Sequence, residues 1–254
     1  MILLHRLTSF AVAAVCAVGF LLIILWPALT GQAMLGLLVL IPLLFARLLT
    51  WDFKHFSFWI FLGTPFFYLV ASLFLFIFLE GNLLKTFLAV VVTAGLWLYA
   101  ENLFSFYHLP STYQAYSLEY LSLVLYLVSS FFFTSGAYGV QIFLQLPAWV
   151  PALAVFWVTL FSTVGVFWVS KIGSEISARF AVTGSIILTE LYLVLAMLPT
   201  SFMTNAAIFT TALYLFLGLS RAHVLDKLTW VVLKRYLITG GLLLLVVFAT
   251  SRWI

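Results

Sequence analysis

The sequence from residue 97 to residue 120 reads Trp97-Leu-Tyr-Ala-Glu-Asn-Leu-Phe-Ser-Phe-Tyr-His-Leu-Pro-Ser-Thr-Tyr-Gln-Ala-Tyr-Ser-Leu-Glu-Tyr120. It is the densest run of polar side chains in a chain that is 66% hydrophobic and 7% charged. Soluble domains carry about a quarter charged residues, so this composition excludes a soluble fold. Long apolar segments flank the stretch on both sides, and we therefore expect it to form a polar hairpin at a membrane surface.

The rest of the chain has the same character, with 254 residues and a mean hydropathy of +1.26. A membrane-spanning helix needs about 20 mostly apolar residues, and such segments recur throughout. The ~10-residue alternating segments of a membrane β-barrel are absent from the sequence. The predicted fold is all-α, a polytopic transmembrane helical bundle that forms a single integral membrane domain over residues 1–254. About nine spans are expected, at residues 7–29, 33–50, 58–79, 86–107, 117–140, 148–170, 180–198, 202–219 and 236–250.

The basic residues are distributed unevenly between the two sides of this arrangement. Nine of the 11 fall on the side of the N-terminus, and only Lys85 and Arg252 fall on the other. Cytoplasmic loops carry the excess of Lys and Arg in membrane proteins, so we expect a cytoplasmic N-terminus and an external C-terminus. The net charge of +4 follows from this topology and does not indicate nucleic-acid binding. The nine are Arg6, Arg47, Lys54, Lys171, Arg179, Arg221, Lys227, Lys234 and Arg235.

Patterns typical of a catalytic site do not occur in the sequence. The sequence contains no His-Glu-x-x-His pair, no Gly-x-Ser-x-Gly elbow and no phosphate-binding glycine loop. The single cysteine, Cys16, has no partner in the chain for a disulfide, and it is expected to be a small buried residue. We therefore predict no catalytic residue, no metal site and no cofactor.

Glu190 is the residue whose position within the membrane has the highest free-energy cost. It lies near the middle of the span at 180–198, where a charge costs about 2.5–3.5 kcal/mol on insertion scales. One interpretation is a proton-coupling or substrate-binding carboxyl. The other is a structural hydrogen bond to a neighbouring helix, through Asn205, Thr159 or Thr163.

The polar hairpin carries two more carboxyl groups at some depth, Glu101 and Glu119, together with Asn102. Arg47, at the inner end of the second span, is expected at the same depth. We therefore predict that Arg47 contacts Glu101 or Glu119, with Asn102 or a tyrosine hydroxyl filling the remaining position. The alternative is a polar cavity that is open to the cytoplasm and binds a headgroup or a partner.

The stretch Arg221–Arg235 combines basic and apolar residues. Basic residues near a membrane surface attract anionic lipid by about 1 kcal/mol each. Two interpretations account for this pattern: the basic residues bind anionic lipid, or they only set the orientation of the chain in the membrane. The expected partner is the lipid bilayer, with anionic lipid at this stretch; a protein partner or a homo-oligomer is left open.

The C-terminal third contains the motifs Glu190-Leu-Tyr, Leu198-Pro-Thr-Ser-Phe and Asn205-Ala-Ala-Ile, followed by Tyr214, Tyr236 and a closing Ser-Arg-Trp. With the segment 99–121, these motifs resemble uncharacterised multi-pass membrane proteins of candidate-phyla (Patescibacteria-type) bacteria, over about half the chain. The resemblance implies a location in the bacterial inner membrane. It carries no functional residue over to this chain.

Three functions are compatible with these features. The first is a non-enzymatic scaffold or subunit that acts through partners, which the absence of catalytic patterns favours. The second is a small permease or lipid-handling transporter that uses Glu190, with Pro42 and Gly63-Thr-Pro65 as helix breaks. The third is a membrane-embedded enzyme acting on a lipid-linked substrate at the polar hairpin. The first is our prediction, and the other two remain as alternatives.

Overall fold

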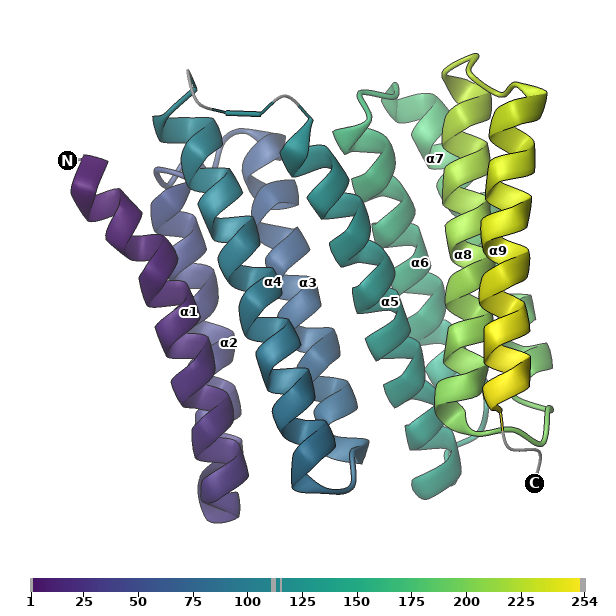
Figure 1. The fold of residues 1–254 in the computed structure, drawn as a ribbon, viewed down its shortest axis with the longest axis horizontal. Coiled ribbons are helices and arrows are strands. Elements are labelled where there is room, and N and C mark those ends of the chain that lie inside the picture. Colours follow the sequence, from purple (N-terminus) through teal and green to yellow (C-terminus); the bar gives the residue numbers. More distant parts are fainter. Residues whose placement is uncertain (1, 111–112, 115, 252–254) are drawn as a thin grey trace. The chain divides into compact units, whose positions relative to one another are not determined.

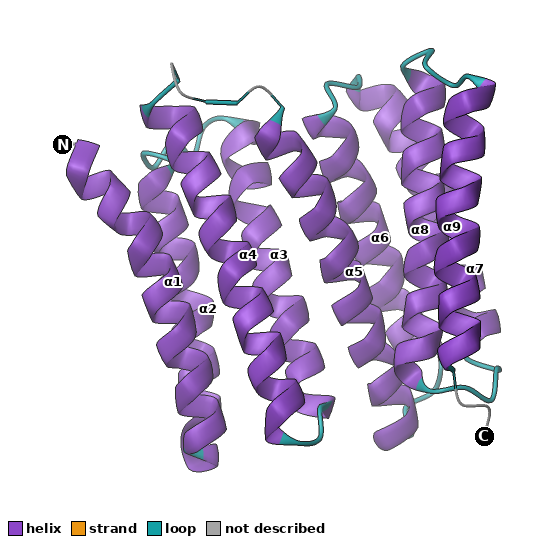
Figure 2. Cartoon of the chain, in the orientation of Figure 1, coloured by secondary structure: helices purple, strands orange, loops and turns teal. Residues whose placement is uncertain are grey.

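The computed structural model describes residues 2–110, 113–114 and 116–251 of the chain. Within these residues the secondary structure is helical and no strand occurs (Figure 2). Nine of the described helices are long and apolar enough to cross a membrane. The predicted fold class, an all-α bundle of about nine spans, is confirmed.

The helices follow one another through short connections. They are α1 (Ile2–Leu25), the short 3-10 helix η1 (Pro27–Leu29), α2 (Thr30–Leu48), α3 (Phe56–Phe78), α4 (Asn82–His108), α5 (Ser117–Phe143), α6 (Trp149–Val169), α7 (Ser174–Leu195), α8 (Phe202–Val224) and α9 (Trp230–Thr250).

The chain divides into two compact units, which we call the first unit (Met1–Ser129) and the second unit (Ser130–Ile254). In the first unit α1 packs against both α2 and α4, and α3 packs against α2 and α4 (Figure 1). The second unit is built on α6 packed against α7, with α8 against α7 and α9 against α8. The single integral membrane domain stays a prediction.

Polar side chains inside the first unit connect its helices. The hydroxyl of Thr64 on α3 donates to the Tyr126 hydroxyl of α5 at 2.9 Å, and Tyr68 of α3 donates to the Val91 carbonyl of α4 at 3.2 Å. Thr93 of α4 donates to Cys16 of α1 at 3.4 Å, and Cys16 is fully buried, as expected. Lipid tails are as apolar as the helix side chains, so the hydrophobic effect does not drive membrane helices together. Hydrogen bonds of this kind and close packing hold them together instead.

The helix ends reflect local chemistry. The side chain of Ser201 caps α8 by accepting from the Thr204 amide, and Thr229 caps α9 by accepting from Val232; both satisfy amides that a helix start leaves free. Gly81 precedes α4 at a φ of 83°, a conformation that glycine adopts without steric cost.

Several helices extend further into the polar segments than the sequence indicated, α7 and α9 among them. α7 begins at Ser174 and includes Glu175 and Arg179, which form an ion pair one turn apart. α9 begins at Trp230, so only residues 225–229 separate it from α8. The reason is that Glu, Lys and Arg are good helix formers, so a helix continues past the apolar segment into the membrane interface.

Candidate functional site: polar groups within the helices

Glu101 is bonded to α1. Its carboxylate accepts a hydrogen bond from the Ser9 hydroxyl at 2.7 Å, and Ser9 is fully buried. The same hydroxyl lies 2.9 Å from the carbonyl oxygen of Arg6. Because α1 packs directly against α4, this contact joins two helices that are distant in the sequence.

Arg47 is not the partner of either carboxylate, and this prediction is wrong. Arg47 lies in the last turn of α2 with its side chain exposed, and within the described residues it forms no ion pair. Long basic side chains extend their charged ends toward water, so the guanidinium has no need of a buried partner. The uncharged hydroxyl of Ser9 takes the place expected for Arg47.

Asn102 and Tyr113 close the polar hairpin on itself. The Asn102 amide nitrogen donates to the Leu98 carbonyl at 2.8 Å, and its oxygen accepts from the Ser117 hydroxyl at 2.8 Å. The hydroxyl of Tyr113 accepts from the backbone amide of Leu118 at 3.1 Å. These bonds connect the end of α4 to the start of α5, which is a structural use of the hairpin's polar groups. Parts of the predicted hairpin, residues 111, 112 and 115, lie outside the described residues.

Glu119 has a different environment from Glu101. It is half-buried in the first turn of α5, and its Oε2 is buried without a hydrogen-bond partner among the described residues. Ser122, one turn further along α5, is also buried. The structure therefore does not bring Glu119, Glu101 and Arg47 into one ion-pair cluster.

Glu190 lies on the exposed face of α7. At about 100° per residue, it is opposite the buried face that contains Gly184, Leu188 and Leu195. Within the described part of the chain, its carboxyl forms neither a hydrogen bond nor an ion pair. It lies five residues before the end of α7, roughly 7–8 Å along the axis at 1.5 Å per residue.

The partners suggested for Glu190 in the structural interpretation are engaged elsewhere. Asn205 is buried near the start of α8 and accepts from the Thr200 hydroxyl. Thr159 and Thr163 donate to carbonyl oxygens one turn earlier in α6, at 2.9 and 2.8 Å. Because α7 presents Glu190 away from the buried faces of α6 and α8, none of these groups meets its carboxyl.

The second unit contains a core of buried hydroxyl groups, which the sequence analysis did not identify. Thr134, Thr159 and Thr163 each donate to a carbonyl of their own helix. The hydroxyls of Ser130 and Ser162 lie 3.4 Å apart, between α5 and α6. Ser135 and Ser185 have buried hydroxyls without a partner among the described residues. The available signal was Ser and Thr recurring inside apolar segments. The members of this hydroxyl core are Ser130, Thr134, Ser135, Thr159, Ser162, Thr163 and Ser185.

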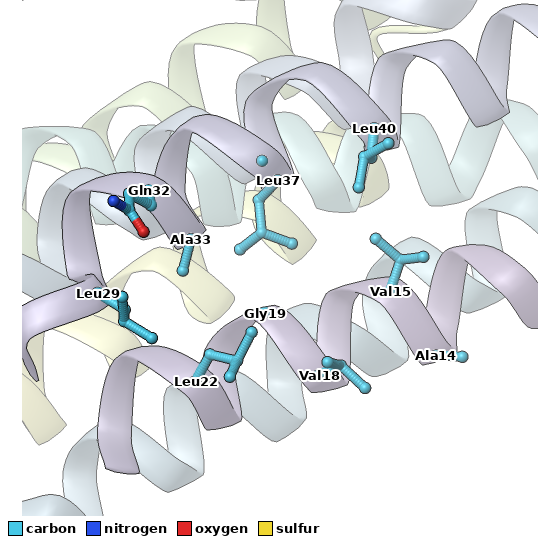
Figure 3. Close-up of a pocket in the computed structure, with 11 residues that line it drawn as sticks. Ala14, Val15, Val18, Gly19, Leu22, Leu29, Gln32, Ala33, Leu37 and Leu40 are labelled. Atoms are coloured by element: carbon cyan, nitrogen blue, oxygen red, sulfur yellow. The ribbon is translucent and has the colours of Figure 1, made fainter. Parts of the chain in front are cut away.

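Two apolar grooves border α1. The larger, of about 470 Å³, runs between α1 and α2, and its lining includes Val18 and Leu22 of α1 and Ala33 and Leu40 of α2 (Figure 3). Gln32 is the one polar side chain that lines it. The second groove, of about 380 Å³, lies between α1 and α4. Both are apolar, as expected for surfaces that contact lipid acyl chains.

The basic stretch at Arg221–Arg235 is spread over the end of α8, the connection and the start of α9. Lys227, Lys234 and Arg235 are exposed, and Trp230 beside them is 74% exposed. No ion pair within the described residues involves these three basic groups. They are therefore free to contact an anionic surface, and anionic lipid binding stays a prediction.

The site residues form no metal centre, since no cluster of three His, Cys, Asp or Glu side chains occurs among the described residues. Comparison of the chain with protein-family models, with curated proteins and with solved structures finds no match.

The contact between Ser9 and Glu101 can be tested against the one that the sequence suggested. We expect Ser9→Ala to lower the free energy of unfolding by about 1–2 kcal/mol, because it removes a hydrogen bond to a carboxylate in a part-buried position. Arg47→Ala is the matched control and should change stability by less than about 0.5 kcal/mol, since exposed side chains contribute little. Unfolding in mixed detergent micelles measures both. Equal losses from the two variants would contradict the assignment.

Proposed function

We propose that this protein is a non-enzymatic integral membrane subunit that acts by assembling with a membrane-embedded partner. The observation that supports this is the position of Glu190: a carboxyl on the exposed face of α7, without a hydrogen bond or ion pair in the described part of the chain. A charged group costs about 2.5–3.5 kcal/mol at the bilayer centre, and Glu190, five residues before the end of α7, bears a part of that cost. A partner helix that supplies a hydrogen bond there reduces this cost.

Glu190 is also poorly placed to reach water. Lys and Arg have long side chains that extend to the membrane surface, but the glutamate side chain is shorter. It starts more than one helical turn inside the end of α7. Val194, which lies between it and that end, is 60% exposed and apolar, and Met197, in the turn just beyond that end, is 85% exposed and apolar, so the surroundings of the carboxyl are lipid-like.

The proposed location is the bacterial inner membrane, with the N-terminus in the cytoplasm. The basic residues at the ends of the helices support this orientation. In it, the exposed Lys227, Lys234 and Arg235 lie at the cytoplasmic surface, where anionic lipids are attracted by about 1 kcal/mol per basic residue.

A transport function is the second candidate, and the hydroxyl core of the second unit favours it. Intramembrane polar groups often mark substrate or ion pathways, and Ser135 and Ser185 have buried hydroxyls with no partner among the described residues. Glu190, however, lies on the opposite side of α7 from Ser185 and Leu188, so it is not a coupling residue for that core. Nothing comparable favours an enzyme, because Asn102 and Tyr113 of the polar hairpin bond to groups of the hairpin itself.

Assembly can be measured as the population of complexes in native membranes. We expect Glu190→Leu to reduce the assembled fraction about three- to tenfold, the equivalent of about 0.6–1.4 kcal/mol for one interhelical hydrogen bond. Glu190→Gln keeps a donor and an acceptor, so it should stay close to the wild type. Native electrophoresis of mildly solubilised membranes, over a dilution series, gives the fractions. A wild-type chain that is monomeric at every concentration would contradict the proposed function.

A further inference from the structure

The exposed face of α7 has the spacing of a coiled-coil seam. Thr183, Ile187, Glu190 and Val194 are separated by four, three and four residues, and all four are exposed. This 3.5-residue repeat is the one with which two helices pack along a shared left-handed seam, the commonest handedness among transmembrane bundles. We call these four residues the α7 seam.

The α7 seam contains a single carboxyl, and this limits the chemistry of its partner. A protonated carboxyl both donates and accepts a hydrogen bond, so two such groups satisfy each other. The basic residues of the second unit that the structure describes lie near helix ends or in connections, and Arg179 on α7 is already paired with Glu175. A second copy of the chain offers Glu190 a complementary group, which is its own Glu190 carboxyl.

The membrane fixes how two copies meet. Copies of one chain insert in the same orientation, so a two-fold axis between them runs along the membrane normal and their α7 helices are parallel. In a two-fold interface each residue faces its own equivalent near the axis. Glu190 of one copy is then opposite Glu190 of the other. One polar residue in an apolar seam also fixes the register of the two helices.

We infer that the partner at this face is a second copy of the chain, which pairs along the α7 seam through hydrogen-bonded Glu190 carboxyls. The inference rests on the proposed function and names its partner. It places Thr183 near one end of the contact and Val194 near the other, each close to its equivalent.

Cross-linking through single cysteines tests this arrangement in native membranes. The one natural cysteine, Cys16, is fully buried on α1, and Cys16→Ala removes it as a background. We expect Thr183→Cys and Val194→Cys to give a disulfide-linked dimer when copper-phenanthroline is added. Val182→Cys is the matched control: it has nearly the same depth and is 46% exposed, but it is turned about 100° away from Thr183, and it should not cross-link.

A second variant connects the dimer to the carboxyl. Glu190→Leu, added to Val194→Cys, should lower the cross-linked fraction about three- to tenfold, and Glu190→Gln should restore it. Equal cross-linking at residues 182 and 183, or no cross-linking at either seam position, would overturn the inference. If seam cysteines fail to react while native electrophoresis still shows a complex that depends on Glu190, the second copy is the wrong partner and the proposed function stands. If the chain is monomeric throughout, both are wrong.

Discussion

A reporter that is active only in the cytoplasm is expected to give a signal when it is fused after Gly173 or after Lys227, and none when it is fused after Gly81 or after Thr200. Successive helices cross the membrane in opposite directions, so the reporter signal should change between present and absent from one connection to the next. The reason for the orientation is the excess of basic residues on the side of Gly173 and Lys227. The difference in reporter signal should be close to all-or-none, because each fusion junction lies on one side of the membrane or the other.

The control uses the same four junctions with a reporter that is active only outside the cytoplasm, and its signals should be the reverse. The pair of junctions at Thr200 and Lys227 is the most informative, since only α8 (Phe202–Val224) separates them along the chain. Cytoplasmic signal at both would mean that α8 does not cross the membrane. The predicted topology of nine spans would then be wrong.

The number and order of the helices could be predicted from the sequence because each span is a long apolar segment between polar ones. The exact ends could not, because apolar length marks the hydrocarbon core rather than the helix. At α7 the predicted span began at residue 180, whereas the helix begins at Ser174 and carries the Glu175–Arg179 ion pair in its first turns. Charged residues such as these are compatible with the membrane–water interface, where a helix can continue while its side chains contact water.

The side chains that meet were harder to predict than the helices. The depth of Arg47 and Glu101 can be read from the sequence, but a contact also requires the rotation of each helix and the identity of its neighbour. The rotation of a soluble helix follows from its one apolar face. A transmembrane helix is apolar all round, so this signal is weak, and the partner of Glu101 proved to be Ser9 on α1.

Glu190 illustrates the same limit. Its cost in the membrane could be inferred from its place in an apolar segment, and we expected it to face other helices of the chain. The structure places it on the exposed side of α7, because Gly184, Leu188 and Leu195 occupy the buried side. The small residue is informative here: a side chain at Gly184 would collide with Phe216 of α8, so this face of α7 is the one that packs closely.

A close aromatic contact of the second unit lies between α5 and α7. The rings of Tyr138 and Tyr192 stack at 4.3 Å with an angle of 17°, and both residues are buried. The hydroxyl of Tyr138 donates to the backbone carbonyl of Tyr192 at 3.0 Å. Phe209 of α8 meets the Tyr192 ring edge-on at 6.4 Å, so Tyr192 contacts two other helices at once.

We expect Tyr192→Ala to lower the free energy of unfolding by about 3 kcal/mol, the lower end of the range for removing a buried aromatic ring. The loss comes from packing, because an emptied space between helices removes van der Waals contacts that lipid cannot replace. Unfolding in mixed detergent micelles, followed by circular dichroism, measures the change. Trp157→Ala on α6 is the matched control: the Trp157 ring is 61% exposed, and its removal should cost less than about 0.5 kcal/mol.

The two hydroxyl groups of this pair should behave differently. Tyr138→Phe removes the bond to the Tyr192 carbonyl and should cost about 0.6 kcal/mol, the average for a hydrogen bond between membrane helices. The Tyr192 hydroxyl is buried without a partner among the described residues, so Tyr192→Phe removes an unsatisfied polar group and should be neutral or stabilising. A larger loss of unfolding free energy from Tyr192→Phe than from Tyr138→Phe would mean that the Tyr192 hydroxyl has a partner in the membrane. That result would favour a polar pathway through the hydroxyl core.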